Sequence, residues 1–139
     1  MLIRPFRADD TPQVVALWQA CGLTRPWNDP HKDIARKLQV QPELFLVVEE
    51  GGRVVASVMA GYEGHRGWVN YLAVVPEHRR VGLGARLMQE VEQRLLALGC
   101  PKINLMVRSA NTEVVAFYRA LGYAPDDVIA LGKRLIPDQ

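Results

Sequence analysis

The chain has 139 residues, enough for one domain with a substantial hydrophobic core. Hydrophobic residues make up 49% and charged residues 23%, and the net charge of +2 forms no basic stripe that would indicate a nucleic-acid partner. The longest apolar runs, such as Phe45–Val48, are too short to cross a membrane, and Met1–Arg4 lacks the apolar region of a signal peptide. Cys21 and Cys100 form neither a metal motif nor a disulfide framework, so a reduced cytoplasmic protein is expected.

Apolar periodicity predicts the elements, and caps, glycines and prolines set their ends. In chain order these are a strand over Leu2–Phe6, a helix capped at Asp9 and stopped by Gly22, a short helix between Asp29 and Pro42, and strands over Leu44–Glu50, Arg53–Tyr62 and Trp68–Val75. Then come the longest helix over Gly84–Leu98, a strand over Ile103–Val107, a helix over Asn111–Leu121 and a last strand over Val128–Leu135. This order predicts a single mixed α/β domain over residues 1–139, with no linker or repeat.

The most informative segment is the turn before the longest helix. Gly82 and Gly84 let backbone N–H groups approach a ligand, and the helix N-terminus adds donors and partial positive charge. Arg79 and Arg80 can add charge-assisted hydrogen bonds to the same anion. The pattern therefore favours a phosphate or pyrophosphate. A dinucleotide fingerprint fits less well, because Leu87 stands where its third glycine belongs. A tight turn with solubilising arginines remains the alternative.

Two blocks of the sequence resemble the GNAT acetyltransferase superfamily. The spacing Arg79-x-x-Gly82-x-Gly84, after Leu72-Ala73-Val74-x-Pro76, is similar to its acetyl-CoA signature, and Asn111, Ala116-Phe117-Tyr118 and Leu121-Gly122-Tyr123 are similar to its second block. The likeness runs from about Ile3 to about Leu135. Trp27–Pro30 and Leu131–Leu135 resemble the small bacterial YpeA-type members. The resemblance implies the GNAT fold, a central and mostly antiparallel sheet flanked by helices.

The resemblance also implies how acetyl-CoA binds. Backbone amides of residues 80–85 would hold the pyrophosphate, and the strand at Leu72 would pair with the pantetheine arm. The Leu72 amide would stabilise the oxyanion formed during attack, while Asn111 would touch the arm and Tyr118 would protonate the departing thiolate. The implied coenzyme-binding residues are Leu72, Ala73, Val74, Arg79, Arg80, Val81, Gly82, Leu83, Gly84, Ala85, Asn111, Phe117 and Tyr118.

Two of these residues also have structural alternatives. Tyr118 lies at a helical position where an aromatic ring can simply pack, although a phenol with a pKa of about 10 stays protonated and able to donate at neutral pH. Asn111 is a good helix N-cap. Capping uses only part of the amide's bonding capacity, so both of its roles are compatible.

The proton acceptor is the least defined part of the predicted site. Relatives that acetylate ribosomal-protein alanine carry a glutamate where this chain has Met106, and histone-type relatives carry one where it has Trp68. Neither residue accepts a proton, which argues against both substrate classes. Glu63 and His65, at the turn between two strands, are the nearest candidates, with a solvated turn as the alternative. Glu63 is the predicted catalytic carboxylate.

The irregular segment after the first helix is expected to border the acceptor amine. Trp27, Asn28 and Asp29 are its predicted contacts, with an anchoring tryptophan and a helix-capping aspartate as alternatives. The three histidines are widely spaced and no carboxylate pattern accompanies them, so no metal is expected.

These residues predict an N-acetyltransferase that moves an acetyl group from acetyl-CoA to a primary amine, either of a small molecule or of a protein lysine or N-terminus. Direct attack is expected, because neither cysteine lies in the predicted site. The chain would act as a monomer or homodimer. One alternative is an acyl-CoA-binding sensor or regulatory module with little catalysis, motivated by the missing carboxylates at positions 68 and 106. A second is binding of an unrelated phosphate-bearing ligand by the glycine turn.

Overall fold

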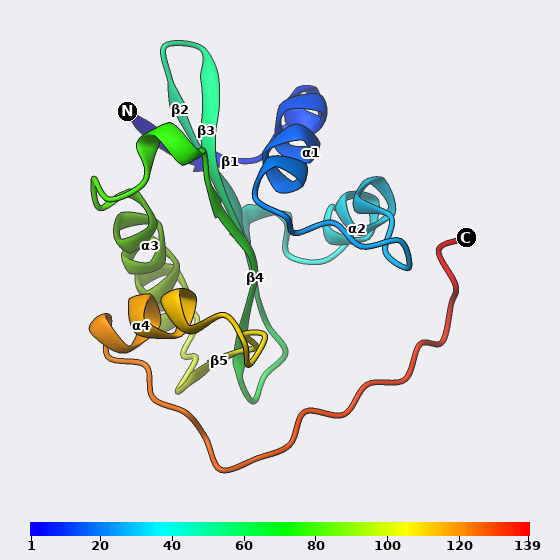
Figure 1. Ribbon diagram of the computed structural model, residues 1–139, viewed down its shortest axis with the longest axis vertical. Coiled ribbons are helices and arrows are strands. Elements are labelled where there is room, and N and C mark those ends of the chain that lie inside the picture. The colour runs from blue at the N-terminus through cyan, green and yellow to red at the C-terminus, as the bar shows by residue number, and fades with distance from the viewer.

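A five-stranded sheet with helices on both faces forms the body of the protein (Figure 1). The computed structural model describes residues 1–139. The strands are β1 (Leu2–Pro5), β2 (Phe45–Glu50), β3 (Arg53–Tyr62), β4 (Gly67–Val74) and β5 (Ile103–Leu105). The helices are α1 (Thr11–Ala20), α2 (Pro30–Lys37), α3 (Leu83–Ala97) and α4 (Thr112–Ala120). Helices α1 and α2 lie on one side of the sheet, and α3 and α4 lie on the other.

The strands follow one another across the sheet in chain order, β1-β2-β3-β4-β5. The first three pairings are antiparallel and the last, between β4 and β5, is parallel. Gly51 and Gly52 both have positive φ and close the predicted two-residue hairpin between β2 and β3. This arrangement confirms the predicted mixed α/β fold with a mostly antiparallel central sheet.

The core lies on both faces of β2 and β3, where one helix covers each side. Trp18 of α1 is fully buried and stacks near Phe45 of β2. From the opposite side, α3 buries Leu87, Val91 and Leu95, the face that its sequence periodicity predicts. None of the helices is both long and apolar enough to cross a membrane.

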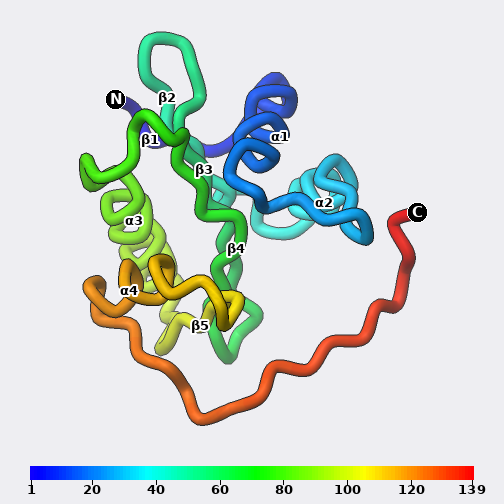
Figure 2. Tube along the Cα trace, viewed as in Figure 1, coloured from blue at the N-terminus to red at the C-terminus, as the bar shows by residue number.

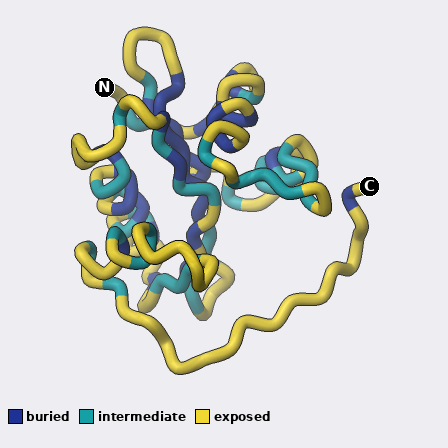
Figure 3. The backbone as a smooth tube through the Cα atoms, in the orientation of Figure 1, coloured by how far each residue is buried: buried dark blue, intermediate teal, exposed yellow.

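The predicted last strand over Val128–Leu135 is wrong. Residues 127–137, called the C-terminal segment below, run as an extended chain from the end of α4 toward α2 (Figure 2). No backbone group of residues 129–137 forms a hydrogen bond with another backbone group, and every side chain of the segment is exposed (Figure 3). The alternation is typical of a strand, but a strand also needs a neighbour, and here the chain leads away from the sheet.

A buried aspartate holds the far end of this segment. Asp138 accepts hydrogen bonds from Arg36 at 2.6 Å and from the Asp29 backbone N–H at 2.7 Å. These donors, the arginine first, lower the Asp138 pKa to about 2. Lys32 donates to the Asp138 carbonyl at 2.6 Å. The chain end is therefore fixed to α2 rather than to the sheet.

A second buried ion pair joins β1 to the start of α1, and its removal is expected to destabilise the fold. Arg4 donates to both carboxylate oxygens of Asp10, at 2.8 and 2.9 Å, and to Glu49 at 2.9 Å. We expect Asp10→Asn to lower the free energy of unfolding by about 2 kcal/mol, less than the full cost of an isolated buried charge because Glu49 remains. Urea denaturation measures this change, with the exposed neighbour Asp9→Asn as the control.

The Arg4–Asp10 pair also makes the free energy of unfolding depend on pH. The Arg4 hydrogen bonds hold the Asp10 pKa below its usual value. A lowered carboxylate pKa contributes stability that is present above the unfolded-state pKa of about 3.9 and lost as the pH falls through the folded-state value. The difference between the native protein and Asp10→Asn should therefore hold at neutral pH and shrink only in strong acid. An equal loss in Asp9→Asn would contradict this origin.

Candidate active site

A β-bulge in β4 shapes the centre of the candidate site. Ser57 pairs with Ala73 and Met59 pairs with Asn70, so two residues of β4, Tyr71 and Leu72, lie opposite the single residue 58 of β3. Such an extra residue leaves the ladder locally unpaired and re-aims the neighbouring groups. Tyr71 adopts a φ of 54°, in the left-handed region that a bulky side chain rarely occupies. The bulge therefore turns Tyr71 and Leu72 out of the regular strand geometry.

A buried hydrogen-bond chain holds this bulge in place. The Trp18 indole N–H donates to Ser57 Oγ at 2.9 Å, and Ser57 Oγ donates to the Tyr71 carbonyl at 3.0 Å. Trp18 also stacks on the Tyr71 ring, with the ring centres 3.7 Å apart. Helix α1 thus fixes both the backbone and the side chain at the bulge, which offsets the cost of the unusual φ.

The glycine turn follows directly after β4 and opens α3. Arg80 and Gly82 both have positive φ, 69° and 80°, so the backbone reverses tightly before the helix begins at Leu83. A Cβ on Gly84 would lie 3.2 Å from the Phe117 ring of α4, so any larger residue would require the ring to shift. The turn presents free backbone N–H groups at the N-terminus of a 15-residue helix.

Two α4 residues face the same side as the bulge. Asn111 caps α4, its side chain accepting from the Val114 N–H at 3.3 Å. Tyr118 is buried between Phe117 and Tyr123, which contact it edge-on. Burial raises the Tyr118 pKa to about 12, and its hydroxyl forms no hydrogen bond within the protein. A protonated donor is thus left available for a ligand.

One cleft of about 990 Å³ joins these groups. Leu72, Asn111 and Tyr118 line it from β4 and α4, and Trp27 and Asn28 line it from the segment before α2. The sequence predicted all five as site residues. Residues of α2, β4 and the segment before α4 line the cleft, and none of residues 79–85 does.

The cleft also contains an acidic group that the sequence did not single out. The Tyr71 hydroxyl donates to Asp33 Oδ2 of α2 at 2.6 Å, and both residues line the cleft. Burial, helped by this contact with the Asp33 carboxylate, raises the Tyr71 pKa, so Tyr71 stays the donor. Arg36 lies 3.4 Å from the other Asp33 oxygen. Asp33 is therefore a carboxylate held in position in the cleft that Leu72 also lines.

Several predicted residues lie elsewhere. Glu63 is in the β3–β4 turn, outside the cleft, where it accepts from the backbone N–H groups of Arg66 and His65; these bonds lower its pKa. Asp29 caps α2 by accepting from the His31 N–H at 2.9 Å. Arg79 donates to the Val74 carbonyl and contacts Cys21 Sγ, so its guanidinium is directed at β4 and α1.

The remaining predicted coenzyme residues surround the turn. In β4, Ala73 is buried and Val74 packs near Gly84. At the turn, Leu83 is buried and Val81 is exposed. No group of three or more His, Cys, Asp or Glu side chains is arranged to hold a metal ion.

Asp33 and Tyr71 had weak sequence signals. A carboxylate in the first turn of a helix is ordinarily explained by the helix dipole, and a tyrosine inside an apolar strand is ordinarily explained by packing. Nothing in the local sequence could have found them, because their contact joins two residues 38 apart in the chain.

The chain is similar to known acetyltransferases. The acetyltransferase (GNAT) family pattern matches residues 11–123. An acetyltransferase of Sodalis glossinidius (strain morsitans) is 54% identical over 140 residues, covering 100% of this chain and 99% of that protein. An acetyltransferase of Yersinia pestis (strain Pestoides F) is 52% identical over 139 residues, with the same coverage.

Solved structures share the fold. Ard1 from Thermoplasma volcanium superposes with a TM-score of 0.77 at 26% identity, covering 88% of this chain and 82% of that one. The NatB acetyltransferase complex bound to CoA and MES contains a chain with a TM-score of 0.78 at 26% identity, covering 89% and 84%. This chain belongs to the GNAT acetyltransferase family. It is an acetyltransferase with the GNAT fold, as the sequence predicted.

Proposed function

We propose that this acetyltransferase uses acetyl-CoA and transfers the acetyl group to a primary amine by direct attack. The observation that carries the proposal is the single cleft in which a bulged Leu72, a protonated Tyr118 and the carboxylate of Asp33 meet. Each of the three supplies a different requirement of acyl transfer: an oxyanion donor, an acid for the leaving group and an acceptor for the amine proton.

The coenzyme would bind along β4 and the glycine turn. Amides of residues 80–85 would hold the pyrophosphate, since they lie at a helix N-terminus where phosphate is favoured. The pantetheine arm would continue beside Leu72–Val74 toward Asn111, with Phe117 closing the turn against Gly84. A solved relative bound to CoA supports the choice of coenzyme.

Acetyl transfer begins with the removal of a proton from the acceptor. The substrate ammonium gives a proton to the Asp33 carboxylate, and the neutral amine attacks the thioester carbonyl to form a C–N bond. The Leu72 N–H stabilises the resulting oxyanion. The attacking nitrogen, now positively charged, loses its second proton to solvent. The C–S bond breaks as the carbonyl re-forms, and Tyr118 gives its proton to the thiolate. Solvent returns a proton to Tyr118 and removes the one on Asp33.

Asp33 takes the role for which the sequence suggested Glu63. It lines the cleft with Leu72, and Tyr71 and Arg36 fix its two oxygens. Glu63 remains a candidate, although it lies in the β3–β4 turn and does not line the cleft. The acceptor would enter past Trp27 and Asn28. A cleft that supplies both an acid and a proton acceptor favours catalysis over an acyl-CoA sensor.

Calorimetric titration with acetyl-CoA tests the coenzyme site. Gly82→Val is expected to weaken binding by about tenfold or more, because a β-branched residue is strained at a φ of 80° and displaces the amides of the turn. Gly52→Val is the matched control: Gly52 has a φ of 78°, equally open surroundings and a place in the distant β2–β3 hairpin. No saturable binding to the native protein, or equal weakening by both variants, would contradict the proposed coenzyme site.

A further inference from the structure

The cleft of the candidate active site is lined by an excess of positive charge. Arg25, Arg36, Lys37 and Arg108 line it, against the single carboxylate of Asp33. The four cations come from the segment before α2, from α2 itself and from the residues that follow β5. A concave surface lined by one sign of charge raises the local concentration of ligands of the opposite sign. The cleft therefore attracts an anion as well as an amine.

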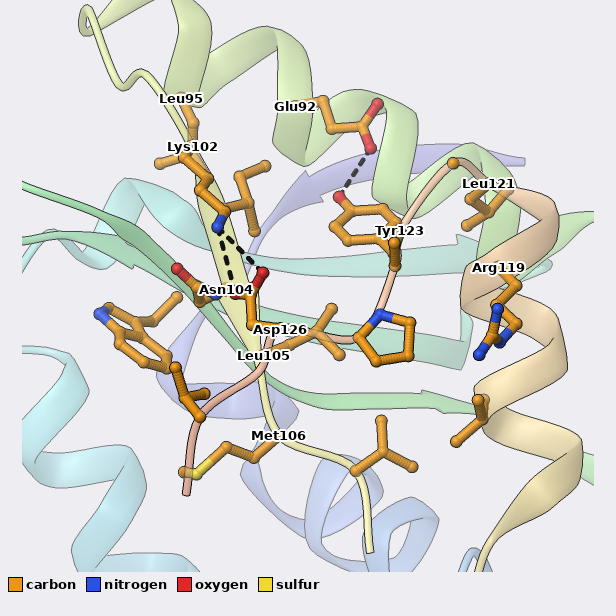
Figure 4. Close-up of a pocket in the computed structure, with 18 of the residues that line it drawn as sticks. Glu92, Leu95, Lys102, Asn104, Leu105, Met106, Arg119, Leu121, Tyr123 and Asp126 are labelled. Carbon is orange, nitrogen blue, oxygen red and sulfur yellow. Dashed lines mark hydrogen bonds and ion pairs between the residues drawn. The ribbon is translucent and has the colours of Figure 1, made fainter. Parts of the chain in front are cut away.

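The pocket beside β5 has a different charge balance. It has a volume of about 940 Å³ and is lined by two cations, Lys102 and Arg119, and by two acids, Glu92 and Asp126. Asp126 accepts a hydrogen bond from Lys102 at 3.1 Å, and Glu92 accepts one from Tyr123 at 2.7 Å (Figure 4). Unlike the cleft, this pocket has no charge excess for an anion to neutralise.

Three of the four cations in the cleft have no carboxylate partner. Arg36 forms ion pairs with two aspartates. Arg25, Lys37 and Arg108 have no carboxylate oxygen within 4.0 Å. Arg25 instead donates to two backbone carbonyls, at 2.7 and 2.9 Å, which do not neutralise its charge. The positive charge of the cleft is thus left for a ligand to balance.

Lys37 holds a defined place among these cations. It follows Asp33 by one turn of α2, so the two side chains lie on the same face of the helix. Its ammonium forms one hydrogen bond within the protein, to the Ala60 carbonyl of β3, and has two further N–H donors. Burial lowers the Lys37 pKa, because the charge has lost part of its hydration. A ligand anion would replace the interactions that this charge lost on burial.

We propose that the acceptor is a small amine that carries a carboxylate or phosphate group a few bonds from its nitrogen. The amine would lie at Asp33 and the anion at Lys37. A few bonds are enough, because side chains one helical turn apart have Cβ atoms about 5–6 Å from each other. This inference rests on the proposed acetyl transfer. A diamine would be disfavoured, since its second ammonium would meet Lys37.

Acceptors that differ in charge test the proposal. β-Alanine and its amide, β-alaninamide, are nearly the same in shape, and phosphoethanolamine and ethanolamine form a second pair. For at least one pair, Lys37→Gln is expected to lower the ratio of kcat/KM for the anionic amine to that for the neutral one by about tenfold or more, because a charge-assisted contact is lost. Comparing this ratio between variants cancels the intrinsic difference in reactivity of the amines. Lys37→Arg keeps the charge and should retain most of the ratio.

The matched control is Arg119→Gln, which removes an exposed positive charge from the β5 pocket. It should leave both ratios unchanged. A drop in Lys37→Gln for the β-alanine pair alone identifies a carboxylate as the anion, and a drop for the phosphoethanolamine pair alone identifies a phosphate. Either result supports the anion site.

Two outcomes would overturn the anion site while leaving acetyl transfer intact. The first is acetylation of these amines with ratios that Lys37→Gln does not change, and the second is an equal drop in Arg119→Gln. If none of the four amines is acetylated, an NMR titration of the backbone amides of α2 decides. Saturable shifts near Lys37 with β-alanine or phosphoethanolamine, lost in Lys37→Gln, would support the site, and their absence would overturn it.

Discussion

Replacing Tyr118 with phenylalanine is expected to lower kcat about 100-fold while leaving the affinity for acetyl-CoA unchanged. The phenol is the only titratable side chain that α4 places in the cleft, and losing a general acid typically costs 100-fold or more. The ring remains, so its packing between Phe117 and Tyr123 is retained. Steady-state kinetics with an amine acceptor and calorimetry with acetyl-CoA measure the two quantities separately.

The neighbouring Tyr123→Phe serves as the control. Its hydroxyl donates to Glu92 at 2.7 Å and lies outside the catalytic cleft, so kcat should remain near the native value. Burial raises the Tyr118 pKa to about 12. The acid therefore stays protonated through pH 6–9, and no loss of activity in that range should come from it. An unchanged kcat in Tyr118→Phe would remove this residue from the acid role.

Replacing Asp33 with asparagine is expected to lower kcat/KM for the amine about 100-fold at neutral pH and to change its pH dependence. The native enzyme can bind the abundant ammonium form and remove its proton. The variant can use only the fraction of the amine that is already neutral. Below the pKa of the amine its kcat/KM should thus rise about tenfold per pH unit, whereas the native profile should be much flatter.

The charges around Asp33 bear on this profile. Tyr71 from β4, Arg36 of the same helix, and Asp138 from the C-terminal end surround the group, and Lys37 also lines the cleft. Tyr71→Phe keeps the carboxylate and removes one hydrogen bond, so it should lower kcat/KM less and keep the flat profile.

Glu63→Gln separates the two candidate carboxylates. A steep profile in Asp33→Asn alone would support Asp33, and a steep profile in Glu63→Gln alone would return the role to the carboxylate that the sequence suggested. A native-like profile in both variants would mean that water removes the proton.

Much of the fold could be predicted because local signals agree with the packing. The helical spacing of Leu87, Val91 and Leu95 matches their burial, and the Gly51–Gly52 turn joins the two strands that it was expected to join. The glycine turn could be identified as a candidate phosphate site because two nearby glycines before a helix have few structural explanations.

The features that the sequence did not predict depend on contacts between residues far apart in the chain. Nothing in the local sequence indicates that Tyr71 leaves regular strand geometry, because the bulge exists only when Trp18 and Ser57 hold it. Asp33 is held in the cleft by the Tyr71 hydroxyl of β4, a contact between residues far apart in the chain. Val128–Leu135 has a strand's composition, but a strand forms only beside a neighbour, and here the segment pairs with no other strand.

The hydrogen-bond chain from Trp18 to the Tyr71 carbonyl also bears on how the protein folds. Part of what holds β4 in its bulged form comes from outside the sheet, since the indole that bonds Ser57 and stacks on Tyr71 belongs to α1. Catalytic geometry should accordingly arise late, when α1 docks onto a sheet that has already formed. A folding intermediate with intact β pairing but a loose first helix would be inactive, and recovery of activity during refolding would follow the burial of Trp18 rather than the growth of strand structure.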